Sequence, residues 1–127
     1  MMTLNNKGQS LVLFIVLIPI MILIMVLVID IGNLYYNKKE LDNIGYLVTS
    51  YGIDNYNEDD VLNKMIKLAN LNDDNLSSVY VNHTNNIEVN LTKNVSFEFG
   101  KMFSLNGIEI KTNYIGDINS KKIKRIK

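Results

Sequence analysis

The feature that most constrains this chain is a run of nineteen residues, Leu11 to Ile29, with eighteen large apolar side chains, one proline and no charge. At about 1.5 Å per residue, the uncharged stretch from Gly8 to Ile29 would form a helix long enough to cross a hydrocarbon core of about 30 Å. Pro19 does not break such a helix, because neighbouring groups and water can satisfy the carbonyl that it frees. We therefore expect one transmembrane helix in contact with membrane lipid.

The residues on either side of this run predict its orientation and processing. Lys7 lies in a short leader without acids, residues 1–8, which favours a cytoplasmic N-terminus and an extracytoplasmic C-terminal domain. After the run, Asp30 stands where a signal-peptidase site needs a small neutral residue, so the helix should be retained. We expect Asp30 at the outer interface, within reach of water. A processing point could precede the run, after Gly8, unless this glycine merely opens the helix.

The helix should continue beyond the membrane, because apolar residues recur at steps of seven, three, four and three. They are Leu34, Leu41, Ile44, Val48 and Tyr51. This spacing predicts one helix over residues 9–51, half in lipid and half in water, with Gly32 and Gly45 as weak points. The stripe could pack on the chain's own domain or on neighbouring copies, and we favour the first.

Residues 52–118 have the pattern of a small α+β domain. A second helix is predicted from an N-cap at Asn57, with acids in its first turn, to about Asn70. Alternation of apolar and polar residues predicts three antiparallel strands, over residues 79–82, 87–99 and 108–114. The expected product is a three-stranded sheet with one apolar face covered by helix.

The charges are unevenly distributed, although the formal net charge is zero. Five of the thirteen basic residues lie in residues 121–127, which leaves 8 basic against 13 acidic residues elsewhere. We expect residues 119–127 to form a solvated basic tail, and the alternative is attraction to an anionic surface such as lipid headgroups. The absence of cysteine excludes disulfides, thiolate metal sites and thiol nucleophiles.

Catalysis finds little support in the sequence. The single histidine, His83, falls in a predicted polar turn, and no nucleophile elbow, phosphate-binding glycine loop or metal-ligand pair is present. The acids at positions 58–60 lack the spacing of a calcium loop. The basic tail has no interleaved aromatic residues, so nucleic acid is not an expected partner. The sequence favours a structural protein that is not an enzyme and has no metal or cofactor.

The order of residues around the apolar run resembles the N-terminus of TadE/TadG-like proteins of the Tad (Flp) pilus system. The matching residues are Gly8-Gln9-Ser10-Leu11-Val12, Pro19, Ile29-Asp30-Ile31-Gly32 and Leu34-Tyr35-Tyr36. The resemblance is sharp from Gly8 to about Leu41. It implies a pilin-like fold and a pseudopilin-like structural component of a bacterial pilus or secretion assembly at the cell surface.

The resemblance also implies partners and site residues. A prepilin peptidase would cut after Gly8 and leave Gln9 as the new N-terminus, and other pilin-like subunits would pack against the helix. The residues expected to shape this packing are Leu13, Pro19, Asp30 and Gly32.

Leu13 departs from the family pattern, since many relatives have a glutamate there that is thought to neutralise the terminal amine of a neighbour. A buried ammonium without a carboxylate partner is costly. The departure fits a subunit at a filament end or a permanent anchor that never polymerises. The alternatives are a monomeric anchored surface-binding module and a pseudopilin of the competence or type II secretion type.

Overall fold

A computed structural model describes residues 6–126 and the side chains of residues 8–126, so most of the predicted leader, residues 1–8, lies outside the described residues. The elements are helices α1 (Asn6–Asp54) and α2 (Val61–Asn72), strands β1 (Ser78–His83) and β2 (Asn86–Ser96), a 3-10 helix η1 (Gly100–Phe103), and strands β3 (Gly107–Asp117) and β4 (Ile123–Ile126). This is the predicted α+β fold with a long N-terminal helix.

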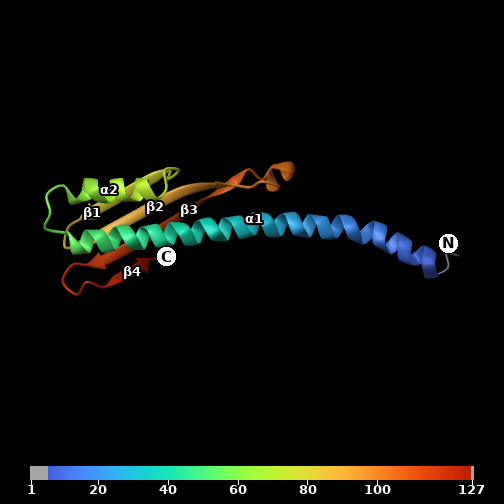
Figure 1. Cartoon of the computed structure of the whole chain (residues 1–127), viewed down its shortest axis with the longest axis horizontal. Helices are drawn as coiled ribbons and strands as arrows, with labels where there is room; N and C mark the ends of the chain where they lie inside the picture. Colours follow the sequence, from blue (N-terminus) through green and yellow to red (C-terminus); the bar gives the residue numbers. More distant parts are fainter. Residues whose placement is uncertain (1–5, 127) are drawn as a thin grey trace.

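Helix α1 is continuous over 49 residues and contains Pro19 without ending there. It extends a few residues beyond the predicted range, 9–51, at both ends. Figure 1 shows its N-terminal half projecting alone, while its C-terminal half runs beside the sheet and α2. We call the folded part, comprising residues 34–126, the head.

The sheet has four antiparallel strands in the order β1-β2-β3-β4, and both helices cover one of its faces. The alternation predicted for β2 is confirmed, because Ile87, Val89 and Leu91 are fully buried. They pack against Leu41, Ile44 and Val48 of α1 and against α2. The whole predicted stripe, from Leu34 to Tyr51, belongs to this core or packs on it, so the stripe serves the chain's own domain.

The prediction of three strands is wrong, because residues 123–126 of the supposed solvated tail form β4. Ile123 pairs with Gly116 of β3 and packs on the core. Arg125 donates from Nη1 to Asp42 Oδ2 at 2.7 Å. The basic residues between Ile123 and Ile126 concealed a short edge strand, and such charges are typical of protected sheet edges.

The predicted start of the second helix is also wrong. The N–H of Glu58 donates to the Asn55 carbonyl, so the residues that follow α1 form a turn rather than the start of the second helix. Asp60 then has a φ of 67° in the left-handed region, so α2 begins only at Val61. Asn57 is therefore not the cap, and the helix ends at Asn72 rather than near Asn70.

Candidate functional site

The first half of α1 exposes apolar side chains on every side. Leu13, Ile22 and Val28 are 58%, 55% and 61% exposed. The most apolar 18-residue stretch of this helix contains no buried residue. The helix is long and apolar enough to cross a membrane, and a surface that is apolar all round is typical of a helix in lipid.

The residues predicted for processing and packing lie along this exposed half. Gly8 and Gln9 belong to the first turns of α1, and Pro19 is exposed within the helix. Leu13 and Pro19 therefore share the open apolar surface, while cleavage after Gly8 stays a prediction.

Asp30, at the end of the apolar run, is only 5% exposed, so the expectation that water reaches it is wrong. Its Oδ1 accepts from the N–H of Glu98 at 2.9 Å, and its Oδ2 accepts from the N–H of Gly100 at 2.7 Å. The N–H of Phe99 lies 3.3 Å from both oxygens. One carboxylate thus binds three successive backbone donors of the loop after β2.

This contact explains why β2 ends at Ser96, although strand was predicted to Phe99. The N–H groups of residues 98–100 point to α1, so they are not available to a neighbouring strand. They lead into η1, and the first donors of a helix have no partner within it. A carboxylate suits them because the amino end of a helix carries partial positive charge. Since Asp30 is about 70 residues away in sequence, no local pattern could reveal it.

The loop held by Asp30 is the tip of the β2–β3 hairpin, residues 97–106, which we call the hairpin tip. The Leu105 N–H donates to the Gly100 carbonyl at 2.9 Å and closes it. Met102, Phe103 and Leu105 are 78%, 55% and 55% exposed. Figure 1 shows that the tip, in orange, extends from the end of the sheet toward the N-terminal half of α1. The sequence prediction assigned residues 100–107, between two strands, to neither helix nor strand, although the density of apolar residues there was a signal.

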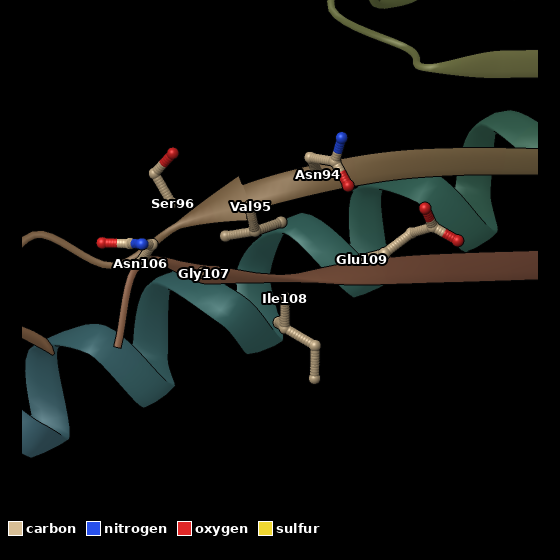
Figure 2. Close-up of a pocket in the computed structure, with 7 residues that line it drawn as sticks. All are labelled: Asn94, Val95, Ser96, Asn106, Gly107, Ile108 and Glu109. Atoms are coloured by element: carbon tan, nitrogen blue, oxygen red, sulfur yellow. The ribbon is translucent and has the colours of Figure 1, made fainter. Parts of the chain in front are cut away.

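A shallow hollow of about 290 Å³ lies where the hairpin narrows toward the tip. Figure 2 shows Asn94, Ser96 and Glu109 on one side of the two strands and Ile108 on the other. Gly107 is required at this neck, since a Cβ there would lie 2.3 Å from the Val95 carbonyl oxygen. Glu109 is the one titratable residue that lines the hollow.

Gly32 and Gly45 have opposite surroundings. A Cβ on Gly45 would lie 2.7 Å from Cδ2 of Tyr114, so this glycine lets α1 approach the sheet closely. A Cβ on Gly32 would meet nothing within 4 Å. The packing of the described chain therefore explains Gly45 and leaves Gly32 open to another molecule.

Two exposed tyrosines follow the junction. Tyr35 and Tyr36 are 69% and 66% exposed. They lie five and six residues after Asp30, or about 8 to 9 Å along the helix. Tyrosine is enriched at membrane–water interfaces, so their position fits an interface just beyond Asp30.

The head contains a partly buried ion pair that accounts for the break in the β2 alternation. Lys93 points inward at a position where an apolar residue was expected, and its Nζ lies 2.6 Å from Asp73 Oδ2. Burial by itself raises the pKa of Asp73, but Lys93 and the Asn75 N–H outweigh it and hold this pKa below its usual 3.8.

His83 is the last residue of β1 rather than part of a turn, so that prediction is wrong. It is half-buried, and its ring lies edge-on to Tyr56 with a centroid distance of 6.5 Å. Among residues 6–126, no group of three His, Cys, Asp or Glu side chains is placed to hold a metal ion.

Comparisons of the chain with protein-family models, curated proteins and solved structures give no match. The resemblance to TadE/TadG-like proteins thus stays a prediction from the residues between Gly8 and Leu41.

Proposed function

We propose that this chain is a pseudopilin-like structural component of a bacterial Tad/Flp-type pilus or related secretion assembly. It acts by anchoring in the cytoplasmic membrane and by packing against other pilin-like subunits. Its N-terminus lies in the cytoplasm and its head lies outside. The observation that carries this proposal is the single helix α1, exposed and apolar through its first half and packed on the sheet and α2 through its second.

A helix of this kind suits assembly because no residue from Leu11 to Ile29 is buried within the described chain. Lipid can cover this apolar surface before assembly, and the helices of other subunits can cover it afterwards. Small residues let membrane helices approach closely, and Gly32 offers an open position at the helix surface. The rigid connection to the head would then fix the spacing of neighbouring heads.

The position of the mature N-terminus tests this proposal most directly. Mass spectrometry of protein extracted from the native membrane should find a chain that begins at Gln9. The variant Gly8→Val should keep the leader, whereas Gly32→Ala, a matched change outside the processing site, should be cleaved normally. A chain that keeps its leader in the native host would favour the permanent monomeric anchor.

Cross-linking tests subunit packing independently of processing. The chain has no cysteine, so each introduced thiol is unique. Leu13→Cys and Ile22→Cys should form cross-links to pilin-like subunits in intact cells. Lys67→Cys, on the exposed side of α2, is the control and should react with a membrane-impermeant thiol reagent from outside. If Leu13→Cys and Ile22→Cys react with lipid but form no cross-link to another protein subunit, assembly is contradicted.

A further inference from the structure

The end of the apolar run fixes where the outer face of a bilayer would lie on α1. Residues 8–29 carry no charge, and as a helix they span about 33 Å, close to the thickness of a hydrocarbon core. The outer boundary of the hydrocarbon therefore falls near Asp30. Tyr35 and Tyr36 then lie at the outer edge of the headgroup layer, close to the membrane–water interface where tyrosine is enriched.

The hairpin tip lies at this same level because Asp30 holds it there. The hydrogen bonds from residues 98–100 to the Asp30 carboxylate are 2.7 to 3.3 Å long. In a 3-10 helix with a rise of about 2 Å per residue, Met102 and Phe103 follow Gly100 within about 6 Å. The headgroup layer on each side of a bilayer is about 5 to 8 Å thick, so Met102 and Phe103 are separated from Gly100 by no more than about the thickness of this layer.

The chemistry of the tip suits that layer. Met102 is the most exposed of the large apolar side chains in the described chain, at 78%, and Phe103 and Leu105 beside it are more than half exposed. Lys101 is also exposed and adds a positive charge. Apolar side chains next to a basic residue are typical of segments that lie in a membrane interface, and anionic headgroups attract such a charge.

We infer that the hairpin tip is a second membrane contact, in which Met102, Phe103 and Leu105 enter the outer headgroup layer of the bilayer that α1 crosses. Asp30 joins the two contacts, because one buried carboxylate fixes the tip to the helix at the membrane surface. The head is then held to the bilayer at two points and keeps one orientation. This inference rests on the membrane anchoring in the proposed function.

Lipid-quenching of a site-specific fluorophore tests the inference on the full chain. Single cysteines are introduced as Met102→Cys, Val28→Cys and Tyr80→Cys and are labelled with a small environment-sensitive dye. The proteins are reconstituted in vesicles of phosphatidylcholine and phosphatidylglycerol, with or without lipids that are spin-labelled near the headgroup. Val28 is the control within the membrane helix, and Tyr80, half-exposed on β1, is the control on the head.

Headgroup-labelled lipid should quench the dye at Met102→Cys about as strongly as at Val28→Cys, and several-fold more than at Tyr80→Cys. Leu105→Cys should behave like Met102→Cys. Agreement between the two variants would exclude an artefact of a single substitution. If the dye on both tip variants is instead as accessible to aqueous iodide as at Tyr80→Cys, while Val28→Cys is quenched by lipid, the tip inference fails and the anchor stands.

Two further outcomes have distinct meanings. Loss of lipid quenching at Val28→Cys would overturn the membrane anchor itself, and the tip inference with it. Protection of the tip from both iodide and lipid quencher, increasing with the protein-to-lipid ratio, would mean that another copy of the chain covers it. That result would overturn the lipid contact.

Discussion

The two halves of α1 share one continuous backbone and differ in what covers them. Residues 11–29 form the more apolar half, yet all their side chains except that of Val26 are exposed, whereas Leu41, Ile44 and Val48 in the second half are 1%, 4% and 0% exposed. A helix with one apolar stripe can bury that stripe against a sheet and leave its polar side in water. A helix that is apolar all round would still expose apolar side chains on its other sides. Burial within this chain therefore follows the pattern of apolar residues rather than their number, and the first half needs an apolar surrounding from outside.

The largest expected effect is on the stability of the head, when a leucine in the second half of α1 is truncated and compared with one in the first half. Leu41→Ala should destabilise the head by about 2 to 5 kcal/mol, because it leaves a cavity in a packed core. Urea unfolding of the full chain in detergent micelles, followed by hydrogen exchange of the β2 amides, measures this change. Leu23→Ala is the matched control, since Leu23 is 41% exposed and touches no part of the head core. Equal losses in the two variants would contradict the division of α1.

The next test removes the connection between the halves. Asp30→Ala leaves the buried N–H of Gly100 and the partly buried N–H groups of Glu98 and Phe99 without their acceptor, at a cost of about 1 to 3 kcal/mol. Amide exchange measured by mass spectrometry should therefore become faster in the hairpin tip, while the β2 amides at Val89 and Leu91 keep their rates. Asn33→Ala, an exposed polar residue one turn further along α1, should leave the tip unchanged. Unaltered exchange at residues 98–100 in Asp30→Ala would show that the carboxylate does not hold the tip.

The elements with a clear period were predictable from the sequence alone. The apolar run and the stripe from Leu34 to Tyr51 predicted a single long helix, and the alternation from Ile87 to Val95 predicted β2. These patterns are visible because the environment of each residue depends on the face of the helix or strand that it occupies. The same face recurs every few positions along the sequence. The α+β class followed from the order of these elements.

The predictions failed where the deciding partner is distant in sequence or the backbone is unusual. Lys93 interrupts an apolar face because it pairs with Asp73, and Arg125 in the half-basic β4 pairs with Asp42. Asp60 adopts a left-handed backbone conformation, which is uncommon for residues other than glycine, and α2 therefore starts later than predicted. The sequence marked Asp30 as the end of the apolar run, but only the folded chain shows that it binds the hairpin tip.

A smaller effect separates the two glycines of α1. Gly32→Ala should stabilise the isolated protein by up to about 1 kcal/mol, because alanine favours helix and the position is open. Gly45→Ala gains the same helix propensity, but its methyl group would crowd Tyr114 and Thr112. Overpacking of a core costs about 1 to 3 kcal/mol, so the net change should be a loss. Thermal unfolding by circular dichroism in detergent micelles measures both. Destabilisation by Gly32→Ala would show that Gly32 is already packed in the isolated chain.

The smallest expected effect is on acid stability, and it belongs to the head alone. Because the pKa of Asp73 is lowered in the folded chain, ionisation of this residue favours folding at any pH above its unfolded value, near 3.8. That contribution is lost as the pH falls through the lower, folded-state value. The cost of burying both charges offsets much of their attraction, so we expect an effect on the order of 1 kcal/mol.

Asp73→Asn isolates this contribution from those of the other carboxylates. The stability difference between the wild-type chain and Asp73→Asn, measured by urea unfolding at a series of pH values, should be constant near neutrality and shrink below about pH 3.8. A difference that persists unchanged into stronger acid would mean that the Asp73 charge does not stabilise the head. Residues 8–29 contain no titratable side chain, so retention of α1 in vesicles should not change over the same range. Acid should thus loosen the head while the membrane half of the same helix stays in place.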